Sequence, residues 1–211
     1  MKQPCIAIFG AGPAGLMAAT QLVARGATVK LFEQRKNPGR KLLIAGASGL
    51  NITNASEPEA FAASYHGFDQ KWWAHLFEQY SPQNWLAWIE SLGFSVFKGS
   101  SRRWFLEDKK AARFLSEWLK MLEDQGVNLH LESSCVDFVR ASENSWMVTI
   151  LNHSTQNHER LECDAVIFAC GGASWLTDAP AWVRLFELKG LNVVPFESSN
   201  VGYEVSWPKA F

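Results

Sequence analysis

Three glycines near the start of the chain, and one glutamate after them, have the spacing of a dinucleotide-binding site. Gly10, Gly12 and Gly15 follow the apolar run PCIAIF and precede the amphipathic stretch LMAATQLVARG. A strand, glycine turn and helix of this kind present backbone N–H groups and a helix dipole to a pyrophosphate. Glu33 lies 18 residues beyond Gly15, where this fold places a carboxylate on a ribose diol.

The acid also bears on which nucleotide binds. Glu33 disfavours a nucleotide with a 2′-phosphate, because two anions would meet, although the nearby Lys30 and Arg35 soften that exclusion. FAD and NAD share an ADP half, so the fingerprint alone does not separate them.

The elements that must position these residues favour FAD. A second strand over 27–32 ends at Glu33, as the fingerprint requires. The segment 133–163 contains no good helix, whereas a simple nicotinamide domain continues to alternate strands and helices. Instead the sequence predicts a β-meander used as a crossover, with strands over 135–141, 145–151 and 159–163.

A buried parallel strand follows the meander at 164–170. It ends in Gly171 and Gly172 at the carboxyl edge of the predicted sheet, where nucleotides bind and glycines allow close approach. A plain turn after a strand is the alternative explanation of this pair. The order of fingerprint, meander and glycine pair resembles flavoproteins with two dinucleotide-binding domains.

A basic turn and an amide-rich segment lie between the second strand and the middle of the chain. Arg40 and Lys41, after Gly39, can offset pyrophosphate charge. The loop that begins at Gly46 supplies neutral hydrogen-bonding groups suited to a flavin's imide edge or ribityl chain, from Asn51, Thr53 and Asn54. The alternative is a solvated basic turn followed by an Asx-rich loop.

The stretch NPGRKLLIAGASGLNITN at 37–54 makes the resemblance more specific. It resembles the YhiN or HI0933-like family of bacterial FAD-dependent oxidoreductases, whose pattern is Gly-Arg-Lys, a glycine-rich loop and Asn-x-Thr-Asn. The similarity extends over essentially the whole chain, through GGASW at 171–175. Most of the family has Gly-Gly-Gly-Arg-Cys before the first Asn, whereas this chain has GASGL, which indicates a divergent branch without that Arg and Cys.

The resemblance implies an α/β fold with a Rossmann-like FAD-binding domain and the start of a second domain. We expect residues 1–190 to form the first domain, with a helical and hairpin excursion at about 56–125, and residues 191–211 to begin the second. Because family members are longer, we expect these 211 residues alone to hold FAD weakly. The candidate cofactor-binding residues are Gly10, Gly12, Pro13, Ala14, Gly15, Glu33, Gly39, Arg40, Lys41, Gly46, Asn51, Thr53, Asn54, Val136, Cys170, Gly171 and Gly172.

The middle of the chain has helical periodicity in three places, and it is rich in tryptophan. We expect helices over 69–79, 82–92 and 109–125, a hairpin between the last two, and a return to the main sheet at 127–132. Six of the ten tryptophans lie in this section, and core packing explains them better than a ligand platform does.

Composition excludes several classes of protein. With 20 Lys plus Arg against 21 Asp plus Glu, the net charge of −1 gives no general attraction to nucleic acid or anionic lipid. Four cysteines without a Cys-x-x-Cys pair, and five histidines without paired metal spacing, predict no dithiol motif and no metal site. Glycines break the apolar start, and no apolar run reaches the length of a membrane span, so we expect a cytoplasmic protein.

The sequence thus predicts an FAD-dependent oxidoreductase that transfers a hydride to or from an unidentified small molecule. NAD(P)H is the candidate electron donor, and neither a catalytic residue nor an oligomeric state is predicted. Two alternatives stay open: a truncated nucleotide-binding module without turnover of its own, and an NAD-dependent dehydrogenase.

Overall fold

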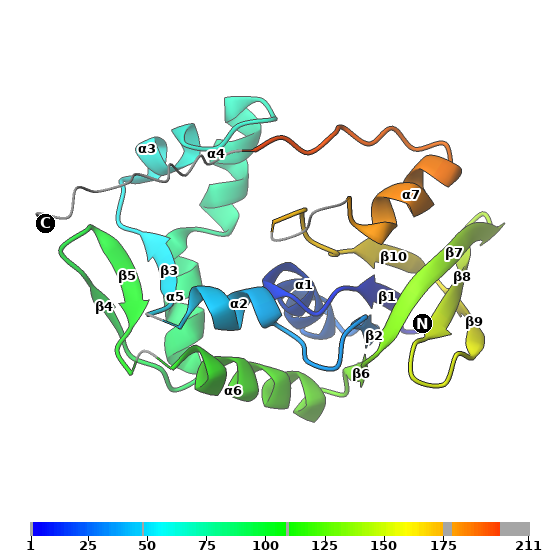
Figure 1. Cartoon of the computed structure of the whole chain (residues 1–211). Helices are drawn as coiled ribbons and strands as arrows, with labels where there is room; N and C mark the ends of the chain where they lie inside the picture. Colours follow the sequence, from blue (N-terminus) through cyan, green and yellow to red (C-terminus); the bar gives the residue numbers. More distant parts are fainter. Residues whose placement is uncertain (1, 48, 109, 175–178, 199–211) are drawn as a thin grey trace, which may run out of the picture. The chain divides into compact units, whose positions relative to one another are not determined.

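The computed structural model describes residues 2–47, 49–108, 110–174 and 179–198 (Figure 1). The chain divides between Cys170 and Gly171 into two compact units. The first unit contains both the glycine fingerprint and the meander, so it positions most of the candidate residues.

A four-stranded parallel sheet with the order β10-β1-β2-β6 is the centre of the first unit. In register, Phe9 lies opposite Phe32 on one side and Phe168 on the other, so β1, β2 and β10 end at one carboxyl edge. The predicted parallel strands, including the return to the sheet after the excursion, are confirmed. The strands are β1 (Cys5–Phe9), β2 (Thr28–Phe32), β6 (Asn128–His130) and β10 (Ala165–Phe168).

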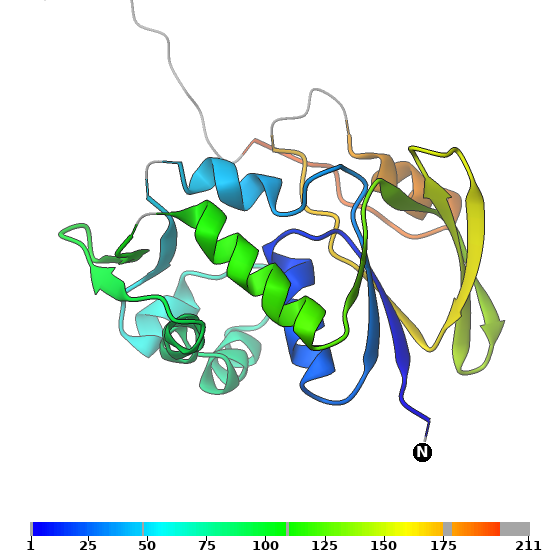
Figure 2. The same ribbon diagram turned by 90° about the horizontal axis from the view of Figure 1, so that it is seen from below.

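The two faces of this sheet are covered by different layers (Figure 2). Side chains alternate along β1, so that Ile6 and Ile8 join one core cluster while Ala7 and Phe9 join another. The first cluster packs on α1 (Pro13–Val23) and α6 (Ala111–Asp124). The second packs on the predicted antiparallel meander, which is confirmed as β7 (Ser133–Ser142), β8 (Ser145–Asn152) and β9 (His158–Cys163).

A buried hydrogen bond fastens α6 to α1. The indole Nε1 of Trp118 donates to Thr20 Oγ1 at 2.9 Å, and that hydroxyl donates to the Leu16 carbonyl at 2.9 Å. Trp85 and Trp88 stack on each other, with ring centroids 4.8 Å apart, and both rings contact Trp118. The expected packing role of these three tryptophans is therefore confirmed.

The excursion contains the predicted helices α4 (Gln70–Gln79) and α5 (Pro82–Ser91), preceded by an unpredicted short helix, α3 (Pro58–Ala63). Ser81 caps α5, as expected, by accepting a hydrogen bond from the Asn84 N–H at 3.1 Å. The predicted hairpin is confirmed as β4 (Val96–Lys98) and β5 (Arg103–Leu106).

The expectation of a loop over 46–54 is wrong for its last four residues. These form β3 (Asn51–Asn54), which pairs antiparallel with β5, and the short helix α2 (Arg40–Ala45) precedes it. Thr53 lies opposite Trp104, so the strand depends on a partner about 50 residues away. Polar composition alone gave no signal of that pairing.

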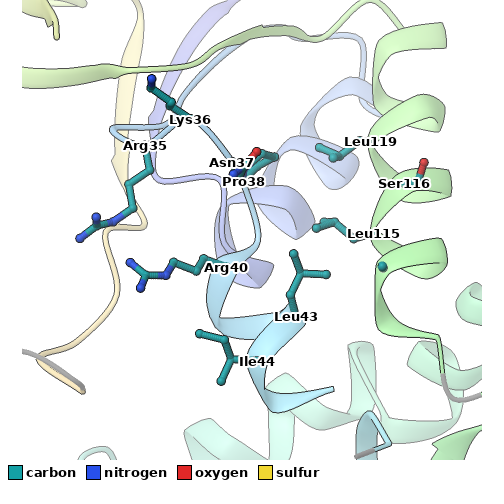
Figure 3. Close-up of a pocket in the computed structure, with 11 residues that line it drawn as sticks. Arg35, Lys36, Asn37, Pro38, Arg40, Leu43, Ile44, Leu115, Ser116 and Leu119 are labelled. Carbon is teal, nitrogen blue, oxygen red and sulfur yellow. The ribbon is translucent and has the colours of Figure 1, made fainter. Parts of the chain in front are cut away.

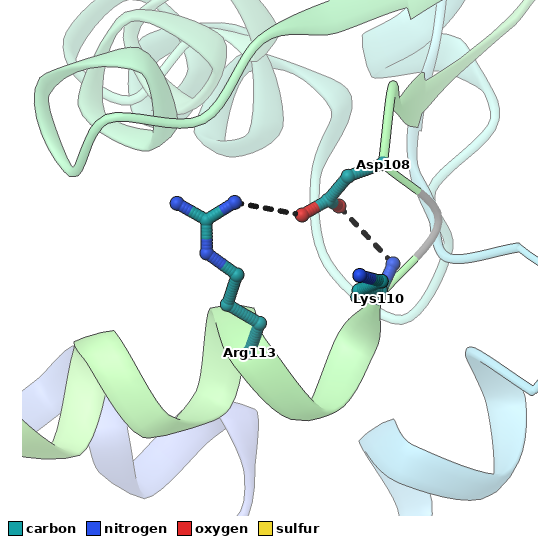
Figure 4. A network of polar contacts seen from close by, with 3 residues as sticks. All are labelled: Asp108, Lys110 and Arg113. Carbon is teal, nitrogen blue, oxygen red and sulfur yellow. Dashed lines mark hydrogen bonds and ion pairs between the residues drawn. The ribbon is translucent and has the colours of Figure 1, made fainter.

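A carboxylate fixes the start of α6 (Figure 4). Asp108 accepts a hydrogen bond from the Lys110 N–H at 3.1 Å and forms an ion pair with Arg113 at 3.2 Å. The Arg113 guanidinium also lies over the Phe94 ring, 5.1 Å from its centroid. These contacts satisfy a helix-terminal N–H and hold the first turn against the core.

The second unit contains one described helix, α7 (Ala181–Leu188). Trp182 of this helix packs against Phe186 and Phe196 and donates its indole N–H to the Gly171 carbonyl at 3.1 Å. Most of the segment 191–211, which we expect to begin a second domain, lies outside the described residues, because these end at residue 198.

Candidate cofactor-binding site

Two of the fingerprint glycines are required by the protein's own packing. Gly10 has a φ of +107°, and a Cβ at this position would collide with the Ala169 carbonyl. A Cβ on Gly15 would collide with the Gly10 carbonyl oxygen. These contacts bring the helix close to the strand ends, which is the role that the spacing predicts for Gly15.

Gly12 is different, because no described protein atom requires a glycine there. It is the N-cap of α1, with an extended backbone at φ −83°, and a Cβ would meet no described atom within 4 Å. The first turn of α1 contains no acidic residue. The space beside Gly12 is therefore open at the positive end of an 11-residue helix, which suits a pyrophosphate.

The Glu33 carboxylate is held beside this turn by backbone N–H groups. One oxygen accepts from the Ala11 N–H and the other from the Arg35 N–H, each at 3.0 Å. The Glu33 N–H in turn donates to the His130 carbonyl at 2.8 Å. Since a carboxylate has about four acceptor positions, it retains capacity for the hydroxyls of a ribose.

Ala11 also holds the basic turn that begins at Gly39. The Gly39 N–H donates a hydrogen bond to the Ala11 carbonyl at 2.8 Å. Gly39 has a left-handed backbone, with φ +63°, and a Cβ there would collide with the Leu115 side chain. Arg40 and Lys41, both exposed, follow as the first residues of α2. Ala11 thus brings together Glu33 and the basic turn, and sequence analysis missed it because only its backbone takes part.

Cys170 lies at the same carboxyl edge, directly after β10. Its thiol donates to the Phe9 carbonyl at 3.4 Å. Burial, and secondly the negative charge of Glu33, raise the pKa of the Cys170 thiol to about 11. The Cys170 thiol therefore keeps its proton at neutral pH.

Val136 occupies a bulge of the meander. The register of β7 against β8 shifts between Cys135 and Asp137, and the Val136 side chain is 38% exposed. A bulge re-aims a side chain away from the regular alternation, so this residue is free to face a ligand.

The other candidates have local structural roles. Gly46 is buried, and a Cβ there would collide with Ala111 of α6, so packing explains this glycine. Asn54 accepts a hydrogen bond from the Ser56 N–H at 3.0 Å, and Asn51 and Thr53 belong to the sheet formed with β5. In the second unit, Gly171 has a φ of +74°, which favours glycine. Contact of all these residues with a cofactor stays a prediction.

Three further observations on the described part of the chain concern metal ligands, membrane-spanning helices and a histidine. No three His, Cys, Asp or Glu side chains are grouped there as a metal site requires. None of the helices described has the length and apolar character needed to cross a membrane. The His130 ring stacks on Phe32 at 4.8 Å, and burial and then Lys30 lower its pKa, so it is neutral at pH 7.

Known proteins are similar to this chain in sequence. The chain is 28% identical over 201 residues to a ribosomal RNA dihydrouridine synthase of Haemophilus influenzae, which covers 93% of this chain and 48% of the relative. It is 29% identical over 171 residues to a 3-dehydro-bile acid delta(4,6)-reductase of Clostridium scindens, covering 79% of this chain and 39% of that one. The chain therefore spans about half the length of the curated relatives it matches.

Solved structures show the same fold. A flavocytochrome c3 fumarate reductase in an open conformation matches 82% of this chain and 34% of its own, with a TM-score of 0.54 and 20% identity. The model of the HI0933-like protein Rossmann domain matches residues 4–202. The glycine fingerprint and the parallel sheet agree with that match, and this chain belongs to the family of HI0933-like proteins with a Rossmann domain.

Proposed function

We propose that this chain is the FAD-binding part of an oxidoreductase that reduces or oxidises a small molecule. The single observation that carries the proposal is the geometry around Ala11. Its N–H and carbonyl bring the Glu33 carboxylate and the Gly39 turn to the open space beside Gly12. An acid for a ribose, an open helix terminus for phosphates and a cationic turn are the groups that the ADP half of FAD requires.

Each of these groups has a defined task in the proposed site. FAD supplies the two-electron redox chemistry when it is bound. Glu33 accepts hydrogen bonds from the adenosine ribose, while Arg40 and Lys41 balance the pyrophosphate charge. The raised pKa keeps the Cys170 thiol protonated at neutral pH, so we assign it no nucleophilic role.

The reaction class comes from the relatives. A dihydrouridine synthase and a delta(4,6)-reductase are both named for the reduction of carbon–carbon double bonds. We propose the same class for this protein, with NAD(P)H as the source of the hydride. The support is a shared family at less than 30% identity, and it does not identify the substrate.

A second candidate function is nucleotide binding without turnover by these residues alone. The observation in its favour is that the chain spans about half the length of the two curated relatives. In that case the groups around Ala11 bind FAD, but these residues do not turn it over.

One anaerobic experiment separates the two. The purified chain is kept in saturating FAD, reduced with NADPH or photochemically, and mixed with a panel of α,β-unsaturated carbonyl compounds. Reoxidation of the flavin faster than in a protein-free FAD control supports the oxidoreductase. Binding of FAD without faster reoxidation supports the binding function, and failure to bind FAD refutes both.

A further inference from the structure

A small pocket of about 170 Å³ lies at the amino edge of the parallel sheet, opposite the carboxyl edge that carries the candidate cofactor-binding site. The larger cavity of about 650 Å³ in Figure 3, by contrast, shares Arg40 with that site, and the charged ends of its cations point away from its leucines. The small pocket contains two of the four thiols of the chain. Its lining residues are Lys2, Cys5, Ser145, Glu162, Cys163 and Asp164.

The backbone brings Cys5 and Cys163 together, although they are far apart in the sequence. The Asp164 N–H donates to the Cys5 carbonyl at 2.8 Å, and the Cys5 N–H donates to the Asp164 carboxylate at 2.6 Å. The chain bends at Asp164, between β9 and β10, so Cys163 directly precedes a residue that is bonded twice to Cys5 (Figure 2). Adjacent strands lie about 4.8 Å apart, and a disulfide spans Cα separations of about 4.4–6.8 Å. The two backbones therefore lie within the reach of a disulfide.

The two side chains also face the same layer. Cys163 is 2% exposed and belongs to the core cluster between β1 and the meander, and Cys5 packs partly buried against that cluster. The Cys163 thiol donates to the Trp146 carbonyl at 3.8 Å. Burial, and secondly the nearby Cys5 thiol, raise the pKa of the Cys163 thiol to about 11. Both thiols thus lie on one side of the sheet and line one pocket.

We propose that Cys5 and Cys163 are a thiol pair that hydrogen peroxide converts into a reversible disulfide. Cys5 is only partly buried, so the oxidant reaches it first. The Cys5 sulfur attacks one peroxide oxygen, which gives a sulfenic acid and one water. The Cys163 sulfur then attacks the Cys5 sulfur, which forms the S–S bond and releases a second water.

The reaction is balanced within these groups. The two thiols lose two electrons and two protons, and the peroxide takes up both and becomes two waters. The new bond joins the start of β1 to the end of β9, so it encloses the fingerprint, the excursion and the meander in one covalent loop. Such a cross-link restricts the unfolded chain, and we expect the oxidised protein to unfold at least about 5 °C higher than the reduced one. This inference goes beyond the proposed flavin function and does not depend on it.

The test is a peptide map of the oxidised chain. The protein is reduced with dithiothreitol, freed of the reductant, treated with hydrogen peroxide, alkylated at its remaining thiols and digested without reduction. We expect a monomer whose mass before alkylation is about 2 Da lower, a cross-linked peptide pair that contains Cys5 and Cys163, and loss of both after dithiothreitol is added again.

Two variants test which thiols take part. The double variant Cys135→Ser and Cys170→Ser retains the pair, so it should form the cross-link as fast as the natural chain and show the same rise in unfolding temperature. Cys5→Ser changes the less buried partner and should form no disulfide and show no such rise. Thermal unfolding of the reduced samples checks that both variants are folded. Oxidation of Cys5 to a sulfinic acid without a cross-link, a disulfide through Cys135 or Cys170 instead, or a disulfide only between two chains would each overturn the proposal.

Discussion

Substitution of Glu33 tests the geometry around Ala11, because the Glu33 carboxylate accepts two backbone hydrogen bonds. Glu33→Gln replaces one oxygen with an NH₂ group, which cannot accept from a backbone N–H. One of the two 3.0 Å bonds to Ala11 and Arg35 is then lost. A hydrogen bond to a charged group contributes about 1.5–3 kcal/mol, and the half-buried position of Glu33 places each bond near the lower end. We expect the free energy of unfolding to fall by about 1.5 kcal/mol in Glu33→Gln and by about 3 kcal/mol in Glu33→Ala.

Affinity for FAD should fall independently of stability. Loss of the charge-assisted bond to the ribose predicts a Kd about 10- to 150-fold higher in Glu33→Ala. Flavin fluorescence during titration measures the Kd, and urea unfolding measures stability in the same samples. Glu90→Gln, on the exposed side of α5, is the matched control and should change neither quantity. A folded Glu33→Ala protein that binds FAD within twofold of the natural chain would refute the role of this acid.

Four further predictions follow from individual residues. Gly12→Ala should leave the thermal unfolding temperature nearly unchanged, because the space beside Gly12 is open, but it should weaken FAD binding at least tenfold. Gly15→Ala should instead lower the free energy of unfolding by about 1–3 kcal/mol, because the added Cβ would meet the Gly10 carbonyl. Trp118→Phe should cost about 1 kcal/mol in urea unfolding, since it loses the bond to Thr20, and no change would mean that this bond contributes nothing. Replacing all four cysteines with Ser or Ala should leave flavin reduction by the donor intact; loss of reduction in a folded, flavin-loaded variant would contradict this. Burial raises the Cys170 pKa from 9.0 to about 11, so as the pH rises the thiol is deprotonated in the unfolded chain before it is in the folded chain. The free energy of unfolding should therefore fall as pH rises from 9 to 11, and it should fall less in Cys170→Ala.

The elements that could be predicted are those with a local pattern. The apolar run of β1, the periodicity of α6 and the turn-separated strands of the meander are local patterns, and the structure has each of these elements. Glycine spacing likewise located the turn before α1 and the acid after β2. Each of these patterns can be read from residues that are neighbours in the sequence.

What could not be predicted depends on distant partners or on backbone atoms. The strand β3 forms by pairing with β5, and the sequence NITN does not indicate that pairing. Gly46 has the appearance of a ligand-contact glycine in the sequence, yet Ala111 of α6 occupies the space that a Cβ would need. Ala11 joins the acid to the basic turn through its N–H and carbonyl, and such a role leaves no trace in side-chain chemistry.

The most direct test of the account is a comparison of FAD, ADP, FMN and NAD⁺ as ligands of the purified chain by calorimetric titration. The groups around Ala11 are predicted to hold the ADP half, so FAD should bind, ADP should compete with it, and FMN should not. NAD⁺ should bind at least tenfold more weakly than FAD. Binding of NAD⁺ in preference to FAD, or binding of FMN that ADP does not displace, would contradict the assignment of this chain as the ADP-holding part of a flavoprotein.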